Sequence, residues 1–183
     1  DSLAAAPDAS GDVLGAAARL YAAYAVVFVT DPDRSANLAV HARDHGVRAL
    51  CADGRQPRCG IDKLPYTDLE SRLGKAGPDD AALMLSYVIG SLAYIRTHGE
   101  DLEALAELPR IESVLNRLLV ISPDSDAALV NTYLGVLNTL RPAALGGQPE
   151  RGQMYFERAL ELTGRRDLSV LVDYARGYAR LVY

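Results

Sequence analysis

The last third of the sequence carries a spacing of small and aromatic residues that fits two helices in close contact. Gly152, Phe156 and Ala159 are four and then three residues apart, and an earlier pair, Leu134-Gly135, precedes them. Two helices approach closely where one of them presents a small side chain, and a ring fills the groove beside the crossing. We therefore expect Gly135, Gly152, Phe156 and Ala159 to hold a helical pair together.

The same spacing is that of the small, aromatic and small positions in the second helix of a tetratricopeptide repeat. An ordinary amphipathic helical hairpin would satisfy it as well. A second instance occurs upstream, where Ala42, Gly46 and Ala49 repeat the intervals. The sequence predicts an all-α fold of irregular tetratricopeptide-like helical hairpins stacked into a short superhelix. Residues 11–183 are expected to form one domain, and residues 1–10 a disordered or linker segment.

Apolar residues recur three and four positions apart along nearly the whole chain, which indicates helices rather than strands. Turn and capping signals divide this pattern. Thr67 and Glu70, for example, form a capping-box sequence at the start of a short helix. The expected helices cover about residues 12–29, 34–52, 67–74, 79–97, 101–108 and 111–121, and others follow around Gly135, around Phe156 and from about 168 onward.

The charge pattern argues against nucleic-acid binding. The net charge is -5, and acidic and basic residues are interleaved, so we expect no positive surface for a phosphate backbone. The longest apolar stretch, Leu20–Val29, has about half the length needed to cross a bilayer. The sequence begins at Asp1 and not at Met, so we expect a processed or trimmed chain, with any export signal or lipid anchor upstream.

The sequence contains two cysteines, Cys51 and Cys59, on either side of a polar segment with Gly and Pro. A disulfide would close this short loop, stabilise the fold by about 2–3 kcal/mol and imply an oxidising compartment such as the periplasm. Unlinked thiols and a metal pair are the alternatives, although the spacing is not that of a zinc motif and no histidine lies between the cysteines.

His41 and His45 are the strongest metal-ligand candidates, because they lie four residues apart on one helical face beside Asp44. The segment lacks the glutamate that a zinc hydrolase uses as general base. The sequence also lacks a G-x-S-x-G elbow, a phosphate-binding loop and a dinucleotide fingerprint. We expect surface or packing histidines, no metal, no cofactor and no catalysis. A metal-dependent enzyme centred on the two histidines is a third interpretation of the function.

Tyrosine dominates the aromatic residues, with ten Tyr against two Phe and no Trp. If Gly90 holds the glycine position of a repeat, the groove-facing residues of its helix are Met84, Tyr87, Ser91 and Tyr94. The corresponding residues on the later helix are Leu129, Thr132, Val136 and Thr139. An apolar lining with hydroxyls suits a hydrophobic or amphipathic ligand, or a partner's helix. The alternative is that these tyrosines only pack against neighbouring helices.

With these features placed, the chain resembles the TatT family, the tetratricopeptide-like T component associated with tripartite ATP-independent periplasmic (TRAP) transporters. The residues that carry the resemblance are Leu134-Gly135, Arg141-Pro142, Leu145-Gly146-Gly147, the segment 155–162, and Val172-Asp173-Tyr174-Ala175-Arg176 with Tyr178-Ala179. Weaker similarity extends upstream through Tyr87 and Gly90 and through His41 to Leu50. The resemblance covers most of the chain, and its specific motifs lie in the last third.

The resemblance implies a non-catalytic periplasmic protein that assembles as a homotrimer and docks the substrate-binding P subunit of the transporter against its pores. It also implies a channel for a hydrophobic ligand, in agreement with the groove residues above. Many members are lipoproteins, whose anchoring cysteine this sequence does not contain. Members also continue with helices beyond the Tyr-Ala-Arg motif. Gly146 and Gly147 would permit the turn after Pro142. A helical scaffold that binds a protein or peptide without any link to transport is the alternative function.

Overall fold

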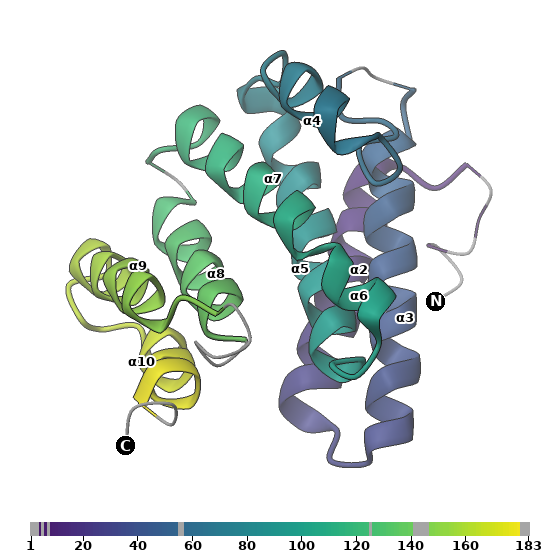
Figure 1. The fold of residues 1–183 in the computed structure, drawn as a ribbon. Helices are drawn as coiled ribbons and strands as arrows, with labels where there is room; N and C mark the ends of the chain where they lie inside the picture. The colour runs from purple at the N-terminus through teal and green to yellow at the C-terminus, as the bar shows by residue number, and fades with distance from the viewer. Residues whose placement is uncertain are drawn as a thin grey trace. The chain divides into compact units, whose positions relative to one another are not determined.

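A computed structural model describes residues 4, 6, 8–54, 57–124, 126–140 and 147–179. Every regular element in this part of the chain is a helix, so the predicted all-α class is confirmed (Figure 1). The chain divides into two compact units, Asp1–Arg117 and Leu118–Tyr183, called here the first and the second unit. The superhelical stacking and the single domain stay predictions.

Three long helical segments run side by side in the first unit (Figure 1). They are α2 (Gly11–Ala23), continued by the π-helical turn η1 (Tyr24–Phe28), α3 (Pro32–Cys51) and α5 (Ala81–Thr97). The Asp31 carboxylate accepts a hydrogen bond from the Arg34 backbone N–H at 2.7 Å, and Pro32 occupies the first helical position of α3. This is a favourable helix start, and it begins α3 two residues before the expected start at about residue 34.

Shorter helices complete the first unit. They are α4 (Tyr66–Leu73), the 3₁₀ turn η2 (Pro78–Asp80), α6 (Leu102–Ala106) and α7 (Leu108–Ile121), of which α7 ends in the second unit. The predicted capping box at Thr67 is wrong, because α4 begins after Pro65 and Thr67 lies inside the first turn. Glu70 instead accepts a hydrogen bond from the Ser113 hydroxyl at 2.8 Å.

Alanine builds much of the interior between the long helices. Ala22, Ala25, Ala39, Ala42 and Ala93 form one buried cluster. Because a methyl side chain adds little thickness, helices that meet through alanines lie close together. The Ala-rich composition of the sequence therefore appears in the structure as close helix packing.

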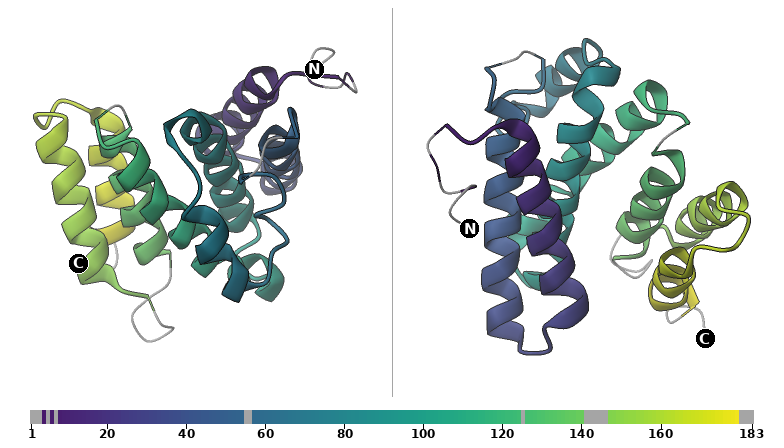
Figure 2. Two further views of the ribbon diagram at one scale, coloured as in Figure 1. Left: turned by 90° about the horizontal axis from the view of Figure 1, so that it is seen from above. Right: turned by 180° about the vertical axis from the view of Figure 1, so that it is seen from behind.

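The second unit consists of α8 (Ala127–Thr139), α9 (Pro149–Leu162), α10 (Leu168–Tyr174) and the π-helical turn η4 (Ala175–Ala179). In the views of Figure 2, α8 and α9 lie against each other and α10 packs beside both. Ala159, Leu160 and Val170 are buried where α9 meets α10. This unit contains the residues whose spacing predicts a packed helical pair.

The segment formed by α2 and η1 is long and apolar enough to cross a membrane by length and composition. Residues Gly11–Phe28 have a mean hydropathy of 1.2, and 28% of them are buried. From the sequence, the longest apolar stretch, Leu20–Val29, is expected to be too short to span a membrane. Core helices of soluble proteins and N-terminal signal sequences meet the same criterion, and α2 packs against α3 and α5.

Candidate functional site

The four groove residues predicted on the first long helix lie on one face of α5, called here the α5 face. Met84, Tyr87 and Ser91 are fully buried, whereas Tyr94 is half-buried. Their spacing of three, four and three residues places them on a single stripe of the helix. A protein partner therefore reaches only Tyr94 directly, and the other three side chains face the interior.

Two glycine contacts set the position of this face. A Cβ atom at Gly46 of α3 would lie 2.9 Å from the Cα of Tyr87, and one at Gly90 would overlap the carbonyl group of Ala42. Both contacts are with backbone atoms, so α3 and α5 cross very closely. The crossing fixes the backbone of Tyr87 and therefore the point from which its ring extends.

The Tyr87 hydroxyl lies within electrostatic reach of charged residues from later elements. Burial raises the pKa of Tyr87 well above its usual range and the charge of Glu107 adds to the rise, whereas the charge of Arg110 and the neighbouring Ser91 hydroxyl oppose it. Tyr87 therefore stays neutral at physiological pH. A neutral phenol both donates and accepts hydrogen bonds.

Glu107, which follows α6, forms an ion pair with Arg43 of α3. Burial raises the pKa of the Glu107 carboxyl, and the charges of Arg43 and Arg110 oppose this rise. The Arg43 guanidinium also lies over the Tyr94 ring, 4.7 Å from its centroid. Tyr94 in turn stacks on His98, with ring centroids 4.1 Å apart. Arg43 therefore contacts both the half-buried end of the α5 face and the acidic group beside it.

Three buried polar atoms on or beside the α5 face form no hydrogen bond of normal geometry with the described residues, although the Tyr87 and Ser91 hydroxyls lie close enough to influence each other. They are the Tyr87 hydroxyl, the Ser91 hydroxyl and the Nε atom of Arg43. An unpaired buried group costs about 1–3 kcal/mol, so a bound molecule that pairs with it removes an existing penalty. The α5 face thus combines apolar side chains with unpaired polar atoms, as sites for mainly apolar molecules do.

The matching residues predicted on the later helix lie on α8, in the second unit. The hydroxyls of Thr132 and Thr139 donate to backbone carbonyls one turn earlier in α8, at 2.8 and 3.0 Å. Both threonines are buried, Val136 is half-buried and Leu129 is 39% exposed. Unlike the hydroxyls on the α5 face, those on α8 are already paired. A common lining made by the two sets stays a prediction.

The α8–α9 crossing brings together the small and aromatic residues that the spacing places on a common face. A Cβ atom at Gly135 would lie 2.8 Å from the Phe156 ring, and one at Gly152 would lie 2.6 Å from the Thr139 methyl group. Phe156 and Ala159 are fully buried. The glycines thus allow α8 and α9 to approach, and the ring fills the space beside Gly135.

The turn that precedes α9 is described only in part. Gly147 is half-buried, and the next residue, Gln148, donates its backbone N–H to the Asn138 carbonyl at 2.9 Å. This bond ties the start of α9 to α8. The remaining residues predicted for the turn, Arg141, Pro142, Leu145 and Gly146, lie outside the described residues.

Over residues 1–183, the whole chain, the sequence matches the family described as TAtT, the TRAP transporter T-component. The chain belongs to this family. No curated protein matches the sequence significantly. The resemblance inferred from the residues is confirmed, and the T-component acts as an accessory part of a TRAP transporter.

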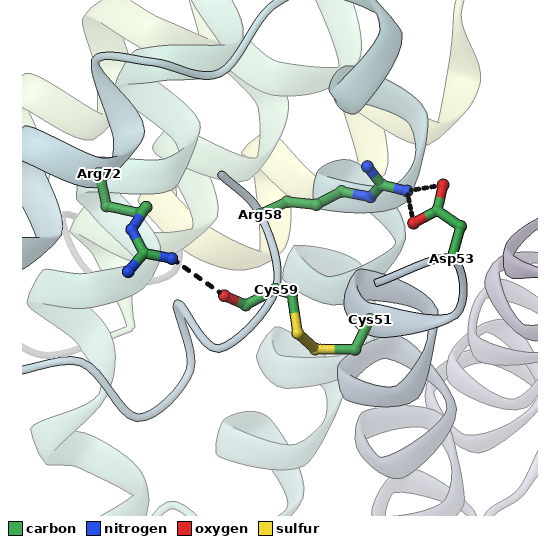
Figure 3. Close-up of a disulfide and its surroundings, with 5 residues drawn as sticks. All are labelled: Cys51, Asp53, Arg58, Cys59 and Arg72. Atoms are coloured by element: carbon green, nitrogen blue, oxygen red, sulfur yellow. Dashed lines mark hydrogen bonds and ion pairs between the residues drawn. A yellow bond between two sulfur atoms is a disulfide. The ribbon is translucent and has the colours of Figure 1, made fainter. Parts of the chain in front are cut away.

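In this T-component a disulfide joins Cys51, the last residue of α3, to Cys59 (Figure 3). The spacing in the sequence left thiols and a metal pair open as alternatives. Both cysteines are half-buried, and the Arg72 guanidinium donates to the Cys59 carbonyl at 3.5 Å. The bond closes the segment between α3 and α4 onto the end of α3.

Sequence reasoning missed the ion pairs that join distant segments of the first unit. Arg58, next to the disulfide, pairs with Asp80, and Arg43 pairs with Glu107. The partners are 22 and 64 residues apart, so no local pattern connects them. For Arg43 the sequence offered one signal. It directly follows Ala42 of the small-residue motif, so it lies beside a close helix crossing, where a charged side chain needs a partner.

His41 and His45 both contact the same aromatic ring from α2. The Tyr21 ring is 5.5 Å from the His41 ring and 5.4 Å from the His45 ring, between centroids. Burial, and then the charges of Arg48 and His41, lower the pKa of His45. Among the described residues, no group of three His, Cys, Asp or Glu side chains is arranged to hold a metal ion.

Proposed function

We propose that this T-component binds the substrate-binding P subunit of a TRAP transporter in the periplasm and holds a hydrophobic small molecule, without catalysing a reaction. Family membership over the whole chain supports the transporter role. The observation that supports the proposed binding is that the buried hydroxyls of Tyr87 and Ser91 on the α5 face form no hydrogen bond of normal geometry with the described residues.

The ligand proposed for the α5 face is mainly apolar and carries one or two hydrogen-bonding atoms. Met84 and Tyr87 are fully buried, so the proposed ligand would lie inside the first unit. There Met84 and the Tyr87 ring would offer apolar contacts, and the hydroxyls of Tyr87 and Ser91 would offer polar ones. A neutral Tyr87 accepts or donates a hydrogen bond without adding charge. The hydroxyls would therefore fix the orientation of the ligand, and the apolar contacts would supply most of the affinity.

The P subunit is proposed to contact the half-buried end of the same face. Tyr94 contacts both the Arg43 guanidinium and the His98 ring there. Tyrosine and arginine are enriched among the residues that dominate binding energy at protein interfaces. Because its two neighbours restrain the Tyr94 ring, less side-chain entropy is lost when a partner binds.

A homotrimer and a lipid anchor belong to the same proposal and rest on the family resemblance. Light scattering from the purified protein tests the trimer, since a trimer has three times the mass of one chain. Lipid anchoring would require a cysteine upstream of Asp1.

Titration calorimetry with the P subunit of the transporter tests the proposed function. We expect saturable binding that Tyr94→Ala weakens about tenfold, as truncating an interface hot spot does. Tyr24→Ala is the matched control, because Tyr24 is an exposed tyrosine of η1 outside the α5 face. Absence of binding by the wild-type chain would instead favour a helical scaffold unconnected to transport. Equal weakening by the two variants would remove Tyr94 from the interface.

A further inference from the structure

A short covalent loop in the first unit places an arginine in the interior. Cys51 and Cys59 are joined eight residues apart, and Arg58 directly precedes Cys59. The Arg58 side chain is 2% exposed. A guanidinium is almost never buried to this extent unless carboxylates surround it.

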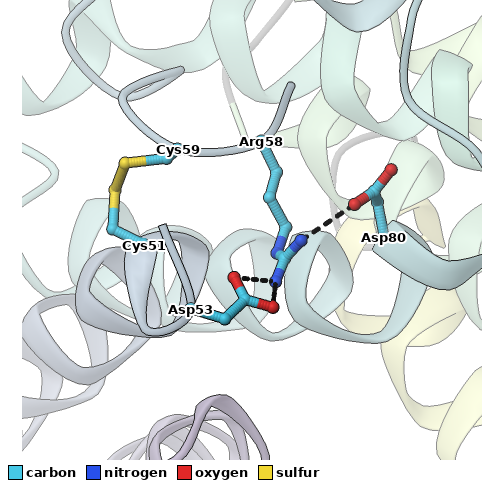
Figure 4. Close-up of polar contacts among 5 residues, drawn as sticks. All are labelled: Cys51, Asp53, Arg58, Cys59 and Asp80. Atoms are coloured by element: carbon cyan, nitrogen blue, oxygen red, sulfur yellow. Dashed lines mark hydrogen bonds and ion pairs between the residues drawn. A yellow bond between two sulfur atoms is a disulfide. The ribbon is translucent and has the colours of Figure 1, made fainter. Parts of the chain in front are cut away.

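Arg58 connects the end of α3 with the start of α5 (Figure 4). One terminal nitrogen donates to both carboxylate oxygens of Asp53, at 2.5 and 2.6 Å. The other donates to Asp80 at 2.9 Å. The second oxygen of Asp80 accepts the Gly77 N–H at 2.9 Å, and Gly77 caps the 3₁₀ turn η2 that leads into α5. The Asp80 carboxylate therefore connects Arg58 to the turn from which α5 begins.

The Asp53 and Asp80 carboxylates differ in how much they need the positive charge of Arg58. The Asp53 side chain is 54% exposed, so water screens its pair with Arg58. The Asp80 side chain is 4% exposed, so losing Arg58 would leave a buried negative charge without a counterion. The Arg58 Nε atom has no partner among the described residues. Because Arg58 directly precedes Cys59, the disulfide restrains the backbone from which the Arg58 side chain reaches Asp80.

We propose that the Cys51–Cys59 disulfide is a redox-sensitive clamp on the start of α5, with Arg58 as the positioning residue that transmits its state. When oxidised, the disulfide keeps Arg58 between Asp53 and Asp80. When it is reduced, the loop is released and Arg58 leaves the interior. Water then enters beside Asp80. The first two turns of α5, which carry Met84 and Tyr87, then lose their anchor. This inference rests on the loop geometry and is independent of any ligand or P subunit.

The opening reaction is thiol–disulfide exchange with a dithiol reductant. One thiolate of the dithiol attacks a cystine sulfur and forms a mixed disulfide, and the cystine S–S bond breaks. The second thiolate of the reductant then displaces the remaining protein sulfur. The reductant leaves as a cyclic disulfide after giving two electrons, and Cys51 and Cys59 take up two protons as thiols. Both cysteines are half-buried, which leaves the bond within reach of a small dithiol.

Hydrogen exchange followed by mass spectrometry tests the clamp on the folded full chain. After reduction with dithiothreitol we expect amides in the first two turns of α5 to exchange about tenfold faster or more, because a buried carboxylate has lost its counterion. Peptides from α8 and α9 are the internal reference and keep their rates. A chain with Cys51→Ser and Cys59→Ser should show the fast pattern without reductant and no further change with it.

Arg58→Met separates the clamp from general stabilisation by the disulfide. With the disulfide intact, this variant should already show fast exchange at the start of α5, and reduction should add little. Unchanged α5 exchange on reduction of the wild-type chain would overturn the proposal. A uniform rise over the whole first unit, global unfolding on reduction, or full additivity of reduction and Arg58→Met would overturn it too. If the serine variant does not fold, the wild-type chain reduced after folding decides between these outcomes.

Discussion

The α3–α5 crossing of the first unit and the α8–α9 crossing of the second are both made with glycines, but the glycines face different atoms. Gly90 lies against the carbonyl group of Ala42, which is backbone. Gly135 lies against the ring of Phe156, which is a side chain. A ring can shift or be replaced, whereas a backbone carbonyl moves only with its helix. The nearest atoms are thus backbone at the first crossing and side chain at the second, where a Cβ at Gly152 would meet the Thr139 methyl group at 2.6 Å before the Gly135 carbonyl oxygen at 3.1 Å.

The largest effect is expected from Gly90→Ala. The new methyl group would overlap the Ala42 carbonyl oxygen and lie 2.8 Å from its carbon, so the helices would have to separate. We expect the free energy of unfolding to fall by about 3 kcal/mol or more. The better helix propensity of alanine, about 1 kcal/mol, offsets only part of the cost of this overlap. Urea denaturation measures the change.

Gly99→Ala is the matched control for this substitution. The nearest atom to a Cβ at Gly99 is the Ile95 carbonyl oxygen, at 4.0 Å. Its stability should therefore stay within about 0.5 kcal/mol of the wild type. Equal stability of Gly90→Ala and Gly99→Ala would mean that the close α3–α5 crossing does not exist in solution.

A smaller loss is expected from Gly135→Ala in the second unit. Its methyl group would meet the Phe156 ring at 2.8 Å, and the ring can move partly aside. We expect a loss of about 1–2 kcal/mol. In the background of Phe156→Leu the same substitution should cost clearly less, because the clashing ring atoms are gone. Additive losses in this double-mutant cycle would contradict the ring-on-glycine contact.

Removing a buried hydroxyl should change the stability of the protein differently in the two units. Tyr87→Phe removes a buried hydroxyl that has no partner among the described residues, so ligand-free protein should be unchanged or more stable. Thr139→Val removes a hydroxyl that donates to the Gly135 carbonyl at 3.0 Å, and should cost about 1 kcal/mol. Thermal unfolding of both variants makes the comparison. A loss for Tyr87→Phe as large as that for Thr139→Val would show that its hydroxyl is paired within the protein.

The smallest effect is a pH dependence confined to the first unit. Burial, followed by the charges of Arg48 and His41, lowers the pKa of His45 below its usual 6.5. The unfolded chain therefore binds the proton more readily, so stability is full above 6.5 and falls as the pH drops through that value towards the folded pKa. Urea midpoints from about pH 7.5 to about pH 5 should decline, and less so in His45→Gln. Equal slopes in both proteins would exclude His45 as the source.

The sequence predicted those contacts whose partners follow a regular spacing. Gly152, Phe156 and Ala159 repeat at helical intervals, so their common face follows from the spacing alone. The four residues of the α5 face could be grouped for the same reason. Their burial could not be predicted, because it depends on helices that are distant in the sequence.

Contacts between residues far apart in the sequence escaped prediction for a related reason. Arg58 and Asp80 are 22 residues apart, and Arg43 and Glu107 are 64 apart. Nothing in the local pattern distinguishes these charges from the solvated ones on other helices. Pro65 is a different case, because it is a local signal. The sequence shows a proline where α4 begins, and the helix starts there and not at the capping box of Thr67.

The α5 face is proposed to hold a mainly apolar ligand through the Tyr87 and Ser91 hydroxyls. Native mass spectrometry of chain purified without detergent tests it most directly, when wild type is compared with Tyr87→Phe combined with Ser91→Ala. We expect a copurified small molecule on the wild type. In the variant we expect its loss, or a marked fall in occupancy, with both proteins folded. Equal occupancy in the two proteins, or no bound molecule in the wild type, would contradict it.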